Sequence, residues 1–467
     1  MLPHQLSALV ESTPPGLAET LRLLDAVDDL FTDGLARPDA GRGEIFDALA
    51  DAFAASPLAD RVAEATGKIG TGAASDEQFA VLAGARTALW GAVHDSLQSQ
   101  VDTVLDRRRE PAAEPVDTGN ALPPNLLAGC RTWLTELAIT GWRGVDEGIL
   151  SSAAQTVEAL LAHPDGRRAA VLLDGLVAEL RACSPIANRT VVPSRRWADL
   201  WTRATTLANG HSPAAATAET TFTGRLLPLG TELYQHSTAF GIRVHWLAEP
   251  ADGSDPRLLR TGLTAAKVDT ILGPSCWRLL AGHPTLLTAV AQDRAVSVTE
   301  LPLRSTGDLL WDESAAEAGD PTDPLSVARV SLARAIAPAT APWDRHPTAI
   351  AEPVFLEGYK VPKADRLGFK LGDTVIDIDT DRLTSAGPLT DKLVKSSTTC
   401  LGLLRWEAGR WLLQPLTVQA PVKKVPTTIH NGQWALGPTD PKAAKAEAKN
   451  GTAVELLRER AGRLLRK

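Results

Sequence analysis

Hydrophobic side chains recur at helical spacing in the first half of the chain. Apolar residues return every three or four positions from Leu17 to Val27, and again from Trp197 to Leu207. This period places them on one face of a helix. We therefore predict two helical regions, at 1–106 and 125–212. The charge, prolines and glycine of 107–124 predict a linker between them.

The pattern changes to an alternation of period two beyond about residue 213. Gly241–Leu247 and Ala295–Leu301 alternate apolar and polar side chains, which is typical of a half-buried strand. Residues 401–418 predict a β-hairpin. We expect a β-rich domain over 213–430, with a helical insertion near 324–337. The predicted fold class is α+β: a helical N-terminal half, then a mostly antiparallel β-rich half, with a C-terminal helix.

The last segment, 440–467, predicts a basic amphipathic helix. It holds eight Lys or Arg against four Asp or Glu residues, so its net charge is +4. The stretch up to Gly451 is charged and alanine-rich and is expected to be mobile. An isolated helix this short is marginal in water, so it should form only when its apolar stripe is buried. We expect this face to bind a protein partner through Val454, Leu457, Arg458, Ala461 and Leu464.

Composition narrows the class of protein. The net charge of −8 is spread along 467 residues, which argues against a general polyanion-binding surface. Four dispersed cysteines indicate reduced thiols in a cytoplasm. The chain shows no signal-peptide pattern, and no apolar run reaches the ~20 residues that cross a bilayer. We expect a soluble cytoplasmic protein with no membrane contact, and its 12 tryptophans are expected mostly in the core.

Familiar catalytic motifs are incomplete in this chain. Gly210-His-Ser-Pro-Ala partly resembles a nucleophile elbow, but Pro213 has no N–H to offer an oxyanion hole. Gly67–Gly72 contains glycines and a lysine without the spacing of a phosphate-binding loop, and a connection between helices is predicted there. We therefore predict neither a catalytic residue nor a cofactor.

Three carboxylates, Asp377, Asp379 and Asp381, form the stretch that looks most like a chemical site. On a strand they would share one face, with the neighbouring isoleucines on the other. The residues that follow match neither a calcium loop nor an aspartate-nucleophile phosphatase. A solvated strand face is favoured over a site for a divalent ion or a basic partner.

His236 and His245, together with Glu232, are a second set of possible metal ligands. The spacing of the two histidines matches no recognised zinc motif. No metal site is predicted, and these residues stand beside the three aspartates as candidates only.

The later half of the chain resembles a known family. Thr399–Val418, in which an apolar strand, a Gly-Arg turn and a Pro-Leu-x-Val strand follow one another, is similar to the closing block of bacterial proteins that begin with a SWIM-type zinc finger. Ala341–Pro347 and Leu134–Trp142 are two further shared elements, so the resemblance covers roughly 125–430. The zinc finger itself is absent here, so zinc does not carry over. Such proteins are encoded with MoxR-type AAA+ ATPases and von Willebrand A-domain proteins, which implies an accessory role.

A large chain without concentrated chemistry favours a non-enzymatic protein-interaction module. The leading hypothesis is an adaptor or substrate-recognition component whose partner is an AAA+ ATPase or a von Willebrand A-domain protein. One alternative is an enzyme or metal-binding protein whose site is assembled only in the fold. Its groups would be Asp377, Asp379, His236 and His245. The other alternative, nucleic-acid binding, depends on Arg107–Arg109 and the basic tail, and is less favoured.

Overall fold

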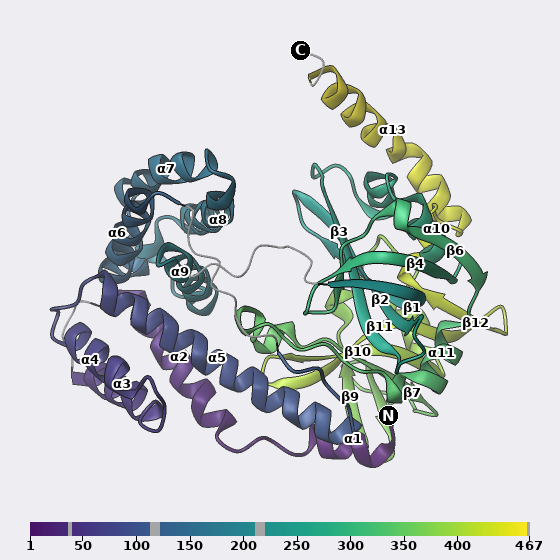
Figure 1. Cartoon of the computed structure of the whole chain (residues 1–467), viewed down its shortest axis with the longest axis horizontal. Helices are drawn as coiled ribbons and strands as arrows, with labels where there is room; N and C mark the ends of the chain where they lie inside the picture. Colours follow the sequence, from purple (N-terminus) through teal and green to yellow (C-terminus); the bar gives the residue numbers. More distant parts are fainter. Residues whose placement is uncertain (36–39, 113–121, 211–219, 465–467) are drawn as a thin grey trace. The chain divides into compact units, whose positions relative to one another are not determined.

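The computed structural model describes residues 1–35, 40–112, 122–210 and 220–464. Within them the fold is α+β, with helices in the N-terminal half and sheets in the C-terminal half, as predicted (Figure 1). The loop motif that follows Gly210 lies outside the described residues.

The chain folds into two compact units. The first, here called the sheet unit, comprises Met1–Thr13, Leu97–Glu114 and Ala216–Lys467. The second, here called the helical unit, comprises Pro14–Ser96 and Pro115–Ala215. The helical unit is therefore inserted into the sheet unit in two pieces.

This division differs from the predicted boundaries. Both ends of the predicted helical region 1–106 belong to the sheet unit. Helix α1 (Pro3–Val10) packs there, where Gln5 Nε2 donates to the Val104 carbonyl at 2.9 Å. The first residues of the predicted linker 107–124 also belong to the sheet unit and are anchored in it, as described below. Distant packing, which a local pattern cannot show, determines this assignment.

Seven helices and most of an eighth make up the described part of the helical unit. They are α2 (Leu17–Asp33), α3 (Ala40–Ala52), α4 (Ala59–Gly70), the larger part of α5 (Asp76–Leu105), α6 (Pro124–Thr140), α7 (Glu147–Leu161), α8 (Arg167–Cys183) and α9 (Ser194–Ala208). The glycine-rich stretch from Gly67 was expected to be a connection, but the last turn of α4 extends to Gly70.

Aromatic side chains fill the centre of the helical unit. Trp197 and Trp201, one turn apart on α9, are fully buried, as their apolar stripe predicts. Phe31 lies 4.7 Å from Trp201 between ring centroids and 5.6 Å from Trp142. The first pair is tilted and the second stacked, and such aromatic pairs add to the stabilisation from burial alone.

The first sheet of the sheet unit closes on itself. Its strands are β1 (Thr220–Gln235), β2 (Ala239–Pro250), β3 (Arg257–Ala266), β4 (Arg294–Leu303), β5 (Asp308–Leu309) and β6 (Ala316–Pro321). The pairings run β1-β2-β3-β5-β4, and β4 pairs back with β1, while β6 adds to β4. Only the β3–β5 pairing among these is parallel.

Alternation along β2 explains the two cores on either side of this strand. Ile242, Val244 and Trp246 belong to the core enclosed by the first sheet. Leu247, on the opposite face, belongs to a second core that also contains Leu401 of the second sheet. The predicted period of two is thus confirmed for this strand.

The second sheet contains the predicted hairpin. Its strands are β7 (Glu352–Glu357), β8 (Gly368–Leu371), β9 (Thr374–Ile378), β10 (Thr399–Glu407), β11 (Arg410–Val422) and β12 (Val425–His430). Their order is β7-β10-β11-β9-β8, and β12 pairs with β11. The β10–β11 hairpin turns at Ala408 and Gly409, between paired Glu407 and Arg410.

Further helices cover the sheet unit. They are α10 (Pro284–Ala291), the predicted insertion α11 (Pro324–Ser331), α12 (Asp391–Lys395), α13 (Pro441–Leu464) and the 3₁₀ segments Gly273–Leu280 and Asn431–Trp434. In the described part of the chain, none of the helices combines the length and the apolar character needed to traverse a bilayer.

Candidate functional site

The structure brings two of the sequence candidates together inside the sheet unit. Glu232 on β1 and His245 on β2 are buried, and His245 Nε2 lies 2.9 Å from Glu232 Oε2. The Tyr234 hydroxyl donates to the same oxygen at 2.8 Å. Arg405 on β10 forms an ion pair with Glu232 Oε1 and donates from Nε to Gln414 Oε1 at 3.0 Å. This cluster therefore joins the first sheet to the second.

Charge partners decide the ionisation of Glu232. Burial alone would raise its pKa, but Arg405, His245 and Arg243 outweigh burial and hold the pKa of Glu232 well below its usual range. Burial lowers the pKa of His245. Burial and the Glu232 carboxylate raise the pKa of Tyr234 to about 12. Glu232 is thus ionised at neutral pH beside a neutral imidazole, whose Nε2 donates to the carboxylate.

The candidate metal ligands His236, His245 and Glu232 are not assembled into one site. His236 lies on the exposed turn after β1, and its Nδ1 is 3.1 Å from Thr238 Oγ1 instead of joining Glu232 and His245. Among the residues that the structure describes, no group of three or more His, Cys, Asp or Glu side chains could hold a metal ion. Glu232, His245 and Arg405 are buried and can cross-link the two sheets, whereas Tyr234 is 37% exposed and the Arg243 side chain 38% exposed at the edge of the cluster.

The three aspartates of the other candidate stretch do not share a strand face. Strand β9 ends at Ile378, and the chain then enters a 3₁₀ turn at Thr380–Arg382. Asp377 Oδ2 lies 3.1 Å from Arg410 Nη1. Asp379 is buried, and its Oδ2 lies 2.7 Å from Arg382 Nε, whereas Asp381 is exposed. The prediction of one carboxylate face is wrong because the strand is shorter than its alternating pattern.

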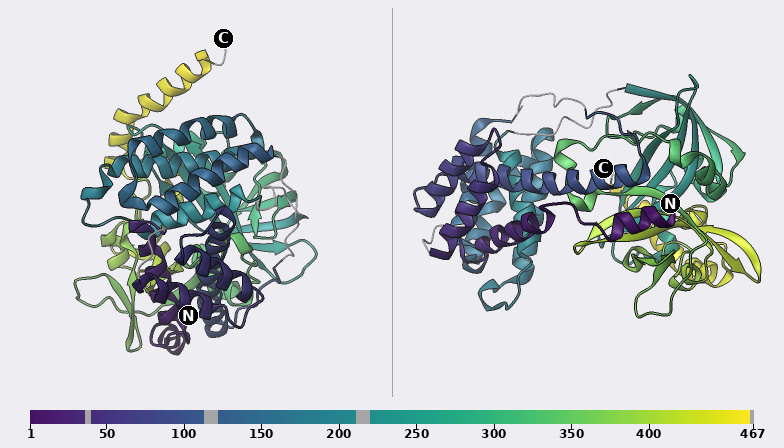
Figure 2. Two further views of the ribbon diagram at one scale, coloured as in Figure 1. Left: turned by 90° about the vertical axis from the view of Figure 1, so that its left-hand side faces the viewer. Right: turned by 90° about the horizontal axis from the view of Figure 1, so that it is seen from below.

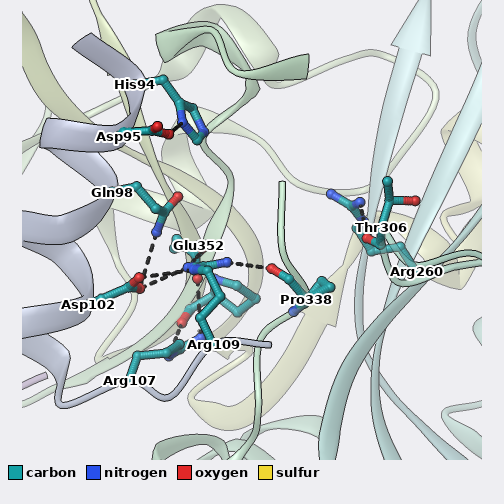
Figure 3. Close-up of polar contacts among 11 residues, drawn as sticks. His94, Asp95, Gln98, Asp102, Arg107, Arg109, Arg260, Thr306, Pro338 and Glu352 are labelled. Atoms are coloured by element: carbon teal, nitrogen blue, oxygen red, sulfur yellow. Dashed lines mark hydrogen bonds and ion pairs between the residues drawn. The ribbon is translucent and has the colours of Figure 1, made fainter. Parts of the chain in front are cut away.

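Arginines of the predicted linker are anchored in the sheet unit (Figure 3). Arg109 donates to Asp102 Oδ2 at 2.9 Å, to Glu352 Oε1 at 2.8 Å and to the Pro338 carbonyl at 2.7 Å. Arg107, with 4% of its side chain exposed, lies 3.4 Å from Glu352. Burial of Glu352 opposes ionisation, but Arg109 and Arg107 keep its pKa below the usual value. Two of the three arginines proposed for nucleic acid are therefore engaged internally.

A buried ion cluster in the helical unit was not predicted. Arg86 on α5 donates to Asp28 Oδ1 at 2.6 Å and Oδ2 at 3.0 Å, and lies 2.7 Å from Asp199. Asp28 and Asp199 line a surface depression of about 640 Å³. Burial raises the pKa of Asp28 to about 6 despite its bonds to Arg86. The sequence held one signal for this cluster: Asp28 and Arg86 are charged residues that each lie within the apolar stripe of a helix.

A second unpredicted cluster contains a histidine. His430 Nε2 lies 2.9 Å from Asp293 Oδ1, and Asp293 has a left-handed φ of 51°. A Cβ added to Gly432 would lie 3.2 Å from His430 Nδ1 and 3.0 Å from Thr231 Oγ1. These two polar atoms therefore both lie next to the Cα of Gly432. His430 is only 2% exposed and Thr231 1%. A substrate could not reach this pair unless the chain opened.

A groove of about 630 Å³ lies in the helical unit, lined by α4, the start of α5 and the end of α9. Its buried lining is apolar at Val62, Ala65 and Ala85 and polar at Gln78. Its exposed lining is charged at Arg61, Glu64, Asp76 and Glu77 and apolar at Leu58. The combination of an apolar floor and a polar rim is typical of a binding groove.

Helix α13 differs from its prediction. It is continuous from Pro441, so the stretch up to Gly451 is helical instead of mobile. Val454 is 1% exposed and belongs to the core of the sheet unit, and Glu447 lies 2.7 Å from Arg278. Val454 therefore packs in the core of the sheet unit and is not exposed to a partner. The side chains of four other predicted contacts lie outside the described residues: Leu457, Arg458, Ala461 and Leu464.

Comparison with protein-family models, with curated proteins and with solved structures finds no match to this chain. The assignment of function therefore depends on the geometry of the described residues.

Proposed function

We propose that this chain is a non-enzymatic protein-interaction module, an adaptor or substrate-recognition component in a bacterial cytoplasm. The groove of the helical unit carries the proposal. Its volume falls within the roughly 300–1,000 Å³ that binding sites usually have. Three features, a helical wall, an apolar floor and a charged rim, fit the mode in which a partner helix lays its apolar face into a groove.

The charge of the lining indicates the kind of partner segment. Three carboxylates and one guanidinium line the groove, and Glu64 is paired with Lys68 and Asp76 with Arg131. We propose an amphipathic partner helix whose basic residue, beside its apolar face, pairs with Glu77. The resemblance of the later half of the chain to proteins encoded with MoxR-type ATPases makes an AAA+ ATPase or a von Willebrand A-domain protein the proposed source of that helix.

The polar clusters support an interaction role over catalysis. The carboxylates of Glu232, Asp379 and Glu352 are each paired with arginine inside the sheet unit. Groups that are neutralised and buried in this way stabilise packing, whereas a general acid or base must reach its substrate. The groove of the helical unit has exposed lining residues, so a partner can reach it.

A glycine offers a way to block the groove without disturbing the fold. Gly84 lies in the groove on α5 and is exposed, and a Cβ added to it would meet no atom within 4 Å. We expect Gly84→Trp to fill the groove. Gly175 on α8 is equally unobstructed and lies outside the groove, so Gly175→Trp is the matched control.

Affinity purification from the native host, with quantitative mass spectrometry, tests the proposal. A protein that is recovered with the wild type and with Gly175→Trp, and lost with Gly84→Trp, would support it. Recovery of the wild type as a lone monomer under gentle conditions, or equal retention by all three chains, would contradict it.

A further inference from the structure

The β11–β12 hairpin projects from the second sheet and ends in a symmetric sequence (Figure 1, Figure 2). Pro421 is paired with Pro426 and Val422 with Val425, and the turn itself is Lys423-Lys424. All six residues are exposed, with Val425 at 62% and Val422 at 39%. The hairpin tip, defined here as 421–426, therefore contributes nothing to the core.

The turn has a backbone that lysine disfavours. Lys423 has a φ of 50° and Lys424 a φ of 69°. Two-residue turns with positive φ at both positions favour Asn-Gly, because a Cβ crowds the backbone in the left-handed region. Strain of this kind persists where the side chains serve a purpose other than stability.

A second hairpin of the same sheet is an internal comparison. The β10–β11 turn places Ala408 at a φ of 51° and uses Gly409 at 76°. It is flanked by Trp406 and Trp411, whose ring centroids lie 5.2 Å apart. Where the turn only closes a packed hairpin, the chain uses glycine. In the hairpin tip, where the flanking side chains are exposed valines, the turn contains two lysines and no glycine.

Neither lysine has an ion pair or hydrogen bond to another side chain within the described residues. The two valines lie opposite each other on adjacent strands, so their side chains share one face. The hairpin tip thus presents two cations and an adjoining apolar pair at the end of a two-stranded antiparallel hairpin.

We propose that the hairpin tip docks onto an acidic segment of a partner protein. Its lysines would pair with carboxylates, while the valines contact an apolar side chain between them. Two lysines are fewer than the clusters of four to eight that mark anionic-lipid binding, and fewer than the phosphate contacts that nucleic acid requires. The inference rests on the proposed interaction function but uses a surface separate from the groove.

A labelled synthetic peptide in which Glu and Leu alternate is the probe, and fluorescence anisotropy with the full chain is the measurement. Lys423→Glu/Lys424→Glu should weaken binding at least about tenfold, because two attractive contacts become repulsive. Lys392→Glu/Lys395→Glu, on exposed positions of α12, is the charge-matched control and should change binding less than about twofold.

Lys423→Asn/Lys424→Gly separates recognition from folding. It gives the turn its preferred residues, so we expect a higher thermal midpoint together with peptide binding weaker than that of the wild type but stronger than that of the charge-reversal variant, because attraction is lost without repulsion being added. Gly84→Trp should leave peptide binding unchanged, so a failure of the groove and a failure of the hairpin tip can be told apart.

Several results would overturn the proposal. They are the absence of wild-type binding to the peptide, wild-type affinity in both hairpin variants, and an equal loss in the α12 control. Lysine-dependent binding to phosphatidylserine vesicles without peptide binding would assign the hairpin tip to a membrane instead. Lysine-dependent self-association in sedimentation experiments would assign it to a second copy of this chain.

Discussion

Each unit buries an arginine–carboxylate cluster, and the two clusters differ in their balance of charge. In the sheet unit, Glu232 is one carboxylate facing Arg405 and Arg243, with His245 beside it. In the helical unit, one guanidinium, Arg86, is shared by Asp28 and Asp199.

The pKa values follow this balance. Surplus cations hold the pKa of Glu232 low, whereas burial, with the second carboxylate of Asp199, raises the pKa of Asp28 to about 6. Burial alone therefore does not decide ionisation, since both carboxylates are buried and their pKa values shift in opposite directions.

The largest expected effect is from removal of Arg405. Arg405→Met leaves Glu232 buried without its main cation, and we expect the sheet unit to lose about 3–5 kcal/mol of stability. Arg410→Met is the control on the same hairpin, because Arg410 is 43% exposed beside Asp377 and should cost less than about 0.5 kcal/mol. Urea unfolding measures both. A loss no larger than that of the control would refute the cross-linking role of Arg405.

Arg86→Met should cost less, about 2–3 kcal/mol at pH 8. Asp28 already has a raised pKa, so it can take up a proton and escape the cost of a buried, unpaired charge. The loss should therefore shrink as the pH is lowered toward 5. Urea unfolding at the two pH values gives the comparison, and a loss that is the same at both would show that Asp28 does not titrate as described.

Lowering the pH should change the stability of the two units in opposite directions. Asp28 binds its proton near pH 6 in the folded chain and at its ordinary pKa of 3.8 when unfolded, so the helical unit gains stability as the pH falls between these values. Glu232 has a depressed pKa, so its contribution is present above its ordinary pKa of 4.5 and is lost as the pH falls below it.

The expected gain in the helical unit is about 2 kcal/mol between pH 7 and 4. Hydrogen exchange with mass spectrometry, which reports each unit separately, measures it. Asp28→Asn is the control and should remove the gain. Parallel loss of protection in both units from pH 6 downward would contradict the assignment.

Residues with local patterns were predictable from the sequence, and those with distant partners were not. The alternation along β2 and the stripe of Trp197 and Trp201 depend on neighbours in the chain, so the elements were found. Glu232 and Arg405 are 173 positions apart, and no spacing rule connects them. The aspartate stretch misled for a related reason: alternation continues past Ile378, although the strand does not.

The smallest effect concerns helix α13. Val454→Ala should destabilise the sheet unit by about 1 kcal/mol, because it removes two buried methyl groups from the core. Leu456→Ala, at a position 51% exposed on the same helix, is the control and should be nearly neutral. Thermal unfolding compares the two. Equal midpoints would show that the Val454 side chain contributes nothing to the stability of the core.

The opposite pKa shifts of the two buried carboxylates are tested most directly by titration of the carboxylates themselves. Selective ¹³C labelling of Asp and Glu carboxyl groups, with Asp28→Asn and Glu232→Gln used to assign the signals, reports each ionisation by NMR. We predict a midpoint for Asp28 near 6 and a Glu232 signal that remains that of the anion below its ordinary pKa of 4.5 for as long as the sheet unit is folded. An Asp28 midpoint at or below about 4, or protonation of Glu232 above its ordinary pKa of 4.5, would contradict these opposite shifts.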